Sequence, residues 1–265
     1  MSYRARLFGT VFLAGFIGIL STLLIDLNAV VKVLPVTTGR PLPMSPWLIK
    51  LLGLIQPTIL VAAATLIGVI LAEKVTLSAP AFEALARRDS FIAALRPQIV
   101  SGVVGGLIGA LAVVTSWIVA RSVLPPEFVA RAEQFNRLLP MPTRFLYGGV
   151  TEEVLVRWGL LTLLVWAGWK LFQRGNGKPQ SKYFIGAILI SSILFGIGHL
   201  PIAVALGSLT IPIGIYIVTA NSIFGLLAGY LYWRKGLEAA IIAHILTHVG
   251  IVTAGYFAII GGSRL

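Results

Sequence analysis

The chain lacks much of what a soluble protein contains. None of its 265 residues is a cysteine, so disulfides, thiolate metal sites and cysteine nucleophiles are excluded. Charged residues make up only 11% of the chain, whereas a soluble domain carries roughly 25%. Apolar residues make up 57%, and the mean hydropathy is +0.94. This composition predicts an integral membrane protein.

Acidic residues are also scarce, with 9 Asp and Glu against 21 Lys and Arg, which gives a formal net charge of +12. No window combines a basic cluster with interleaved aromatics, so we expect no nucleic-acid partner. Most basic residues lie between apolar runs, where they set topology. They are more frequent in the segments that are inside when the N-terminus is cytoplasmic. We therefore expect a multi-pass protein with a cytoplasmic N-terminus.

Seven apolar runs are long enough to cross a bilayer as helices. The first run lacks a small-residue cleavage site, so we interpret it as an uncleaved helix. The loops 73–97 and 121–144 each have leucine and phenylalanine at helical spacing beside arginine, which predicts short interfacial helices. The predicted spans are 7–25, 51–72, 98–120, 145–172, 183–206, 209–233 and 237–260.

The predicted fold is therefore an all-α polytopic transmembrane bundle of about seven spans. We expect a single membrane domain over residues 1–265, in which residues 1–144 are generic spans and loops and residues 145–260 form a motif-bearing core. Small residues spaced by four predict close helix contacts. These are the pairs Gly102/Gly106, Gly105/Gly109 and Gly225/Gly229, together with Gly196 and Gly198; Asn221 is expected to donate a packing hydrogen bond.

The stretch YGGVTEEVLVRWGLL, residues 147–161, places two carboxylates and an arginine in a run otherwise fit for lipid. Ionisable residues inside a span are functional candidates, because each is costly without a partner. Glu153 and Arg157 are four residues apart, the favourable order for an ion pair on one helix face. On an α-helix, Glu152 points about 100° away from its neighbour Glu153, so we expect Glu152 to face a cavity. A purely structural clamp between helices is the alternative interpretation.

All three histidines also lie inside predicted spans. In FGIGH, His199 follows Phe195 by four residues, so the ring of Phe195 can hold the imidazole. In HILTH, His244 and His248 lie one turn apart and can present two imidazoles to one metal ion or one substrate. Interhelical hydrogen bonding by packed histidines would give the same pattern.

These three segments together resemble a known family. EEVLVR fits E-E-x-x-x-R, FGIGH fits F-x-x-x-H, and HILTH occupies the place of H-x-x-x-N, in that order on successive late helices. The chain is similar over residues 145–250 to the CAAX-protease and bacteriocin-processing (CPBP, or Abi) family of intramembrane endopeptidases, which includes the Rce1-type prenyl-protein proteases. The resemblance implies that Glu152 activates water, supported by Glu153 and Arg157. It also implies that His199 helps to hold the water and that His244 stabilises the oxyanion.

Two positions depart from the family pattern. Trp158 stands where the family usually has glycine, and His248 stands where asparagine is usual. A histidine at this position can donate through N–H or ligate a metal. Two alternatives therefore stay open, a metal-free water and a divalent ion such as zinc. The possible ligands of that ion are Glu152, His199, His244 and His248.

The sequence thus predicts an intramembrane endopeptidase, of glutamate type or a metalloprotease, with a catalytic cavity among the last four helices. The expected partners are membrane lipid and a peptide or protein substrate, either prenylated at a CAAX-type C-terminus or bearing a leader. Two other classes use similar residues, namely a proton-coupled transporter and a non-catalytic immunity or scaffold protein. The sequence does not fix the oligomeric state.

Overall fold

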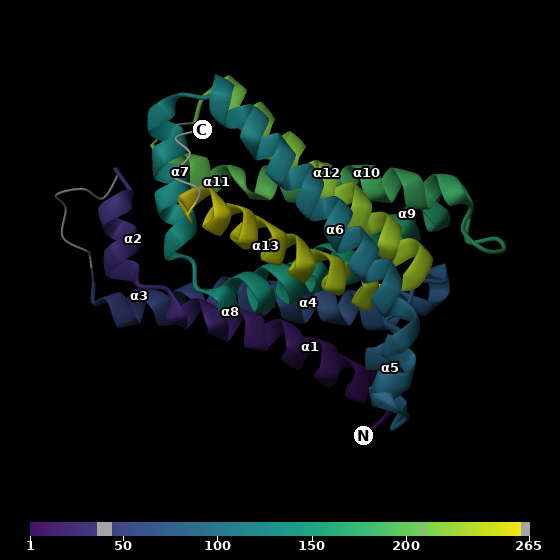
Figure 1. Cartoon of the computed structure of the whole chain (residues 1–265). Coiled ribbons are helices and arrows are strands. Elements are labelled where there is room, and N and C mark those ends of the chain that lie inside the picture. Colours follow the sequence, from purple (N-terminus) through teal and green to yellow (C-terminus); the bar gives the residue numbers. More distant parts are fainter. Residues whose placement is uncertain (36–43, 208, 261–265) are drawn as a thin grey trace.

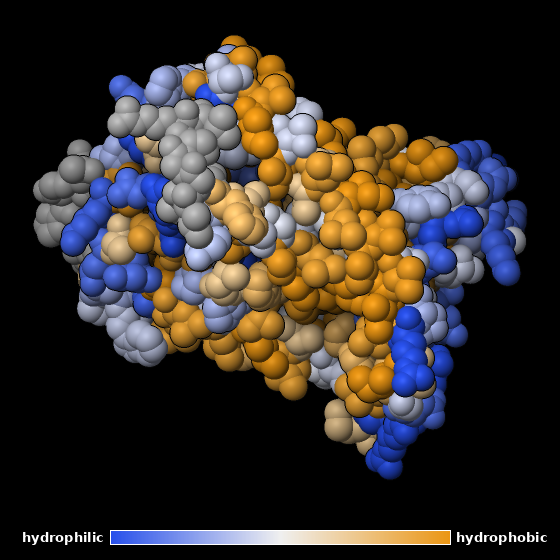
Figure 2. All heavy atoms as spheres, viewed as in Figure 1, coloured by the Kyte–Doolittle hydropathy of each residue, from blue (hydrophilic) through white to orange (hydrophobic). Residues whose placement is uncertain are grey.

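The structure is a computed structural model that describes residues 1–35, 44–207 and 209–260. Within these ranges every regular element is a helix. Seven helical stretches are long and apolar enough to cross a membrane, which confirms the predicted span count and the all-α class. Figure 2 shows an apolar band between hydrophilic regions at the two ends of the bundle. The seven stretches are Tyr3–Leu24, Pro46–Leu71, Phe91–Val123, Met141–Phe172, Ser181–Ala205, Ile211–Lys235 and Leu237–Phe257.

The N-terminal half contains both short helices that the loops predict; their interfacial position stays a prediction. They are α5 and α7, and Figure 1 shows them at opposite ends of the bundle, with α5 at the end where the chain begins. The short helix α2 was not predicted; Asp26 caps it by accepting hydrogen bonds from the N–H groups of Asn28 and Ala29. The elements are α1 (Tyr3–Ser21), η1 (Thr22–Leu24), α2 (Leu27–Val33), α3 (Pro46–Gly53), α4 (Ile55–Leu71), η2 (Glu73–Val75), α5 (Pro80–Arg87), α6 (Phe91–Val123) and α7 (Pro126–Leu138).

The span that carries the two carboxylates is not a uniform α-helix. Two π-helical stretches flank Glu152 and Glu153, η3 (Arg144–Thr151) before them and η4 (Val154–Leu161) after them. Wider π turns are rare and are frequent at functional sites. The remaining elements are α8 (Met141–Thr143), α9 (Thr162–Phe172), α10 (Ser181–Gly198), α11 (Leu200–Ala205), α12 (Ile211–Lys235) and α13 (Leu237–Ile260).

Glycine faces bring the later helices together as the sequence predicts. A Cβ at Gly102 or Gly106 would collide with Ile242 or Leu246 on α13, so α6 and α13 approach closely only because these positions lack side chains. The other pairs pack in the same way. Gly105 meets Leu231, Gly109 meets Thr247, Gly225 meets Ser192, Gly229 meets Ile188, and Gly196 meets Val218. The expectation for Gly198 was wrong, since nothing lies within 4 Å of its ideal Cβ. Asn221 donates to the carbonyl of Ile217 in its own helix.

The first spans hold the carboxylate-bearing span in place. The hydroxyl of Thr151 donates to the carbonyl of Gly15 on α1, at 2.7 Å. Trp158, whose side chain is buried, fills the space that Gly68 leaves on α4. The N-terminal half, generic in sequence, therefore fixes the position of the motif-bearing helix.

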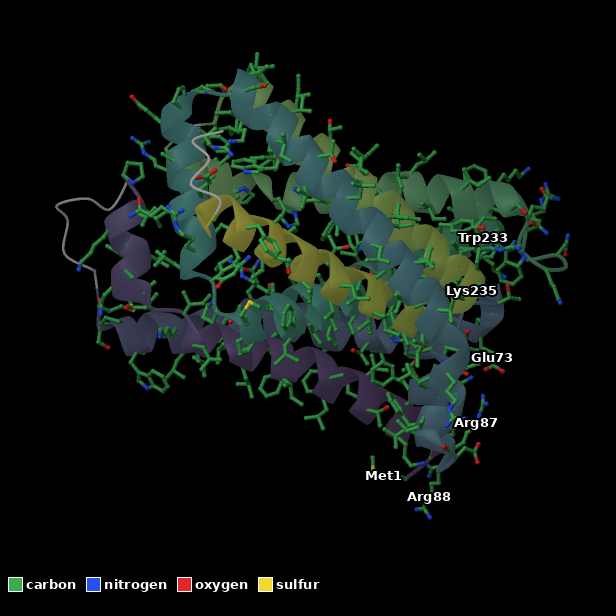
Figure 3. The ribbon with its side chains drawn as sticks, in the orientation of Figure 1. Met1, Glu73, Arg87, Arg88, Trp233 and Lys235 are labelled. Carbon is green, nitrogen blue, oxygen red and sulfur yellow. The ribbon has the colours of Figure 1, made fainter. Side chains whose placement is uncertain are left out.

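Charged residues from distant parts of the chain gather at one end of the bundle. Figure 3 shows Met1, Arg87, Arg88 and Lys235 at this end, and Glu73 and Trp233 lie there as well. This grouping agrees with the side on which the topology prediction puts their segments. The cytoplasmic position of this end remains a prediction.

Enlarging the glycine face of α6 should destabilise the bundle. We expect Gly106→Leu to lower the free energy of unfolding by about 1–3 kcal/mol, the usual effect of overpacking, because the new side chain collides with Leu246. Thermal unfolding in detergent measures the change. Gly9→Leu is the matched control, since nothing lies within 4 Å of an added Cβ there. Equal effects of the two variants would contradict the packing role.

Candidate active site

A buried ion pair stands at the centre of the motif-bearing helices. Arg157 Nη1 lies 3.1 Å from Glu153 Oε1, and the two side chains are 1% and 0% exposed. This contact confirms the predicted pairing of the second carboxylate with the arginine. Breaking such a pair from one side leaves an uncompensated buried charge.

Neighbouring helices surround the guanidinium of Arg157. Its Nη2 donates to the carbonyl of Gly225 on α12 at 3.1 Å. Its Cζ lies 5.0 Å from the ring centroid of Phe195 and 5.9 Å from that of Phe224. Both distances are within the range of cation–π attraction. Phe224 was not predicted as a site residue. The one signal in the sequence is its position beside Gly225.

Glu153 also holds His244, which is buried. The imidazole Nδ1 lies 2.7 Å from Glu153 Oε1. An ionised carboxylate only accepts hydrogen bonds, so the imidazole proton is assigned to Nδ1. The other ring nitrogen, Nε2, is directed towards Glu152 and lies 3.9 Å from its Oε2. One carboxylate therefore sets the tautomer and the orientation of the histidine that faces the other carboxylate.

Glu152 is placed differently from its neighbour. Its side chain is 21% exposed, compared with 0% for Glu153. The separation of 3.9 Å from His244 is too long for a direct hydrogen bond. The two adjacent carboxylates thus divide as predicted from helix geometry, with Glu153 held by Arg157 and Glu152 outside that pair.

His199 lies at the break between α10 and α11. Its Nδ1 is 2.8 Å from the carbonyl oxygen of Phe195, which accepts, so Nδ1 carries the proton and Nε2 is left free. The ring meets Phe195 edge to face, with centroids 4.7 Å apart, which confirms the predicted stacking. Phe195 also contacts His244 edge to face, with centroids 6.1 Å apart. One phenyl ring therefore lies against both histidines and under Arg157.

His248 packs on His244 without bonding to it. The two rings are nearly parallel, at 9°, with centroids 5.0 Å apart. Neither nitrogen of His248 has a hydrogen-bond partner among the described residues. Gly148 on η3 provides the space for this ring, because a Cβ there would collide with His248 Nε2. His248 therefore stacks on His244 and forms no hydrogen bond with it.

The four possible metal ligands do not meet at one point. Within the described ranges, no group of three or more His, Cys, Asp or Glu side chains is placed to hold a metal ion. His244 Nδ1 is already bonded to Glu153. The lone pairs of His244 and His248 lie in nearly parallel ring planes and so do not converge. The set Glu152, His199, His244 and His248 does not fit a zinc centre.

One comparison with known proteins matches part of the chain. Residues 134–250 match the family model described as type II CAAX prenyl endopeptidase Rce1-like. These residues form an Rce1-like domain. The match is consistent with the CPBP family and begins earlier than the resemblance at residue 145, so it also includes the end of α7. With the seven apolar helices, it supports a multi-pass CAAX-type intramembrane endopeptidase. Comparisons with curated proteins and with solved structures give no significant match.

The roles of the two carboxylates in stability should differ. We expect Glu153→Ala and Arg157→Ala each to lower the free energy of unfolding by about 3–5 kcal/mol, because each leaves its partner as an unpaired buried charge. Glu152→Gln should change it much less, since Glu152 lies outside the pair. Thermal unfolding of the three purified variants measures the difference.

A double variant tests whether the unpaired charge is the cause. Glu153→Leu combined with Arg157→Met removes both charges and should be more stable than either single alanine variant. Equal melting temperatures of Glu152→Gln and the two alanine variants would show that the ion pair does not contribute to stability in the predicted way.

Proposed function

We propose that the protein is an intramembrane endopeptidase of glutamate type, in which Glu152 activates a water molecule. The observation that carries this proposal is the division between the two carboxylates. Glu153 is bonded to Arg157 and His244, whereas Glu152 is partly exposed and faces His244 Nε2. A general base needs such access to the proton that it removes.

In the first step, Glu152 removes a proton from water while the water oxygen forms a bond to the carbonyl carbon of the scissile peptide. The carbonyl oxygen then carries the negative charge. His199 supports this step, because its free Nε2 can accept the second hydrogen of the water. In the second step, the C–N bond breaks and the proton held by Glu152 passes to the amine nitrogen of the leaving fragment.

His244 can stabilise the oxyanion only as an imidazolium. Its Nδ1–H is bonded to Glu153, so a neutral ring presents a bare Nε2 to the reacting groups. Protonation at Nε2 creates a donor there, and the carboxylate of Glu153 compensates the new charge, as in other carboxylate–histidine pairs. The Glu153–His244 hydrogen bond therefore supports the role that the family resemblance gives to His244.

His248 has a different part in this scheme. Its ring lies against His244 and over Gly148, and its nitrogens bond to no described residue. We propose that it limits how far the imidazole of His244 can tilt.

An apolar groove between the helices supports a lipid-modified substrate, although none of the proposed catalytic residues lines it. The groove has a volume of about 360 Å³ and lies between α1, α5, α6, η3 and α13. Leu146 and Val150 line it from η3, and Ile241 and Ile242 line it from α13. Glu152 directly follows η3, and His244 lies on α13. We propose that a prenyl chain occupies this groove, which favours prenylated CAAX-type peptides over leader-bearing ones.

Replacing the base should abolish cleavage without unfolding the protein. We expect Glu152→Gln to lower kcat by about 100- to 10,000-fold, the usual contribution of a general base, because an amide of equal volume takes no proton from water. Cleavage of a farnesylated CAAX-type peptide by purified protein in detergent measures this. Near-normal turnover by the variant would reject the role of Glu152.

Adding a chelator to the same assay separates the two catalytic types. The glutamate mechanism predicts unchanged turnover of the wild-type protein. Loss of activity on chelation, restored by zinc, would instead support the metalloprotease alternative. His248→Asn, which restores the residue usual in the family, should keep activity under the metal-free mechanism.

Filling the groove should act on lipid recognition alone. We expect Ala14→Trp to raise the KM for a farnesylated peptide by at least about tenfold, because each apolar CH₂ that loses its site costs about 0.8 kcal/mol. The kcat/KM for the same peptide without the lipid should stay unchanged. Leu13→Trp is the matched control, since Leu13 is exposed and does not line the groove. An equal effect on both peptides would place the prenyl chain elsewhere.

A further inference from the structure

Arg144, the first residue of η3, is a buried cation without an acidic partner. Its side chain is 8% exposed. None of the ion pairs among the described residues includes it. Buried charges in proteins are normally paired with an opposite charge, so this one calls for an explanation that the catalytic groups do not give.

The guanidinium bonds only to neutral oxygens, all at the end of α7. Nε donates to the carbonyl of Leu139 at 3.1 Å, and Nη1 donates to Asn136 Oδ1 at 2.7 Å. Nη2 donates to the carbonyl of Asn136. An arginine has five N–H donors, so one N–H on each terminal nitrogen has no partner among these bonds. Such N–H groups of a guanidinium can donate charge-assisted hydrogen bonds to a carboxylate.

Arg144 lies in line with the proposed catalytic groups. Along the span, Gly148 follows it by four residues and Glu152 by eight. His248 covers Gly148, and His244, stacked on His248, faces Glu152. The row therefore runs from the proposed base, past two histidines, to the unpaired cation.

The length of this row corresponds to a short peptide. Eight residues of an α-helix rise about 12 Å, and the wider π turns shorten this distance. Three extended peptide residues span about 10 Å. Arg144 also lies near the start of the candidate span Met141–Phe172. A charge near the end of a span costs less than one at mid-bilayer.

We propose that Arg144 binds the free C-terminal carboxylate of the substrate, about three residues beyond the scissile bond. This inference rests on the proposed endopeptidase function and deepens it. Arg144 then selects peptides with a free C-terminus at a fixed distance from Glu152. Asn136 and Leu139 hold the guanidinium in place and leave two N–H groups for the substrate.

The test compares one peptide in two forms. The probe is a synthetic peptide with a farnesylated cysteine followed by three apolar residues, ending either in a carboxylate or in a carboxamide. For the wild-type protein we expect kcat/KM to be about 10- to 100-fold higher for the acid, the size of a charge-assisted hydrogen bond. For Arg144→Gln we expect the two forms to be cleaved at similar rates. Arg144→Lys should retain part of the preference.

Asn136→Ala is the matched control. It removes one bond between α7 and the guanidinium but keeps the cation, so it should retain the preference for the acid even if overall activity falls. A purely structural role of Arg144 predicts the opposite pattern, with lower activity for both peptides in Arg144→Gln and an unchanged ratio between them. An unchanged ratio would overturn the proposal, as would equal cleavage of the two forms by the wild-type protein.

A binding measurement separates this inference from the proposed function. The affinity of Glu152→Gln for the acid and the amide is measured in detergent, alone and combined with Arg144→Gln. Tighter binding of the acid that disappears in the double variant supports the carboxylate site even if the wild-type protein cleaves neither peptide. Equal affinity for the two forms rejects the site, even if cleavage itself is observed.

Discussion

The contact between Glu153 and Arg157 unites three parts of the site that are distant in sequence. The carboxylate forms an ion pair with the arginine on its own helix and accepts a hydrogen bond from His244 on α13. The arginine bonds to α12 through Gly225 and packs under the ring of Phe195 on α10. Without this pair, neither the tautomer of His244 nor the placement of Glu152 beside it would be fixed.

A buried ion pair is an expensive way to join helices. Apolar residues of similar volume often give equal or greater stability, because both charges lose their hydration. Here the two aromatic rings and the Gly225 carbonyl offset part of that loss. What the charges provide is direction, since Glu153 pairs with Arg157 and accepts a hydrogen bond from His244 Nδ1. Apolar packing would not orient the imidazole of His244 towards Glu152.

Local patterns in the sequence predict the contacts that lie within one helix. The spacing of Glu153 and Arg157 indicates their pairing, and the spacing of Phe195 and His199 indicates their stacking. The apolar runs give the seven spans because the bilayer fixes their length. The polar and ring contacts between helices could not be predicted in this way. The bond from His244 to Glu153 depends on how α13 crosses η3 and η4, and the stacking of His244 on His248 depends on the space above Gly148. Asn136, which bonds to Arg144, lies in the helix predicted for the loop 121–144, but the pattern that predicts the helix does not predict this bond.

The π-helical winding of η3 and η4 affects how this span is aligned with related helices. A π turn closes its hydrogen bond over one residue more than an α turn does. A relative whose equivalent span is wholly α-helical therefore matches the same positions in space with fewer residues. The correct alignment then contains a gap inside a membrane span. An ungapped alignment would shift Arg144 relative to Glu152 and assign their roles to the wrong residues.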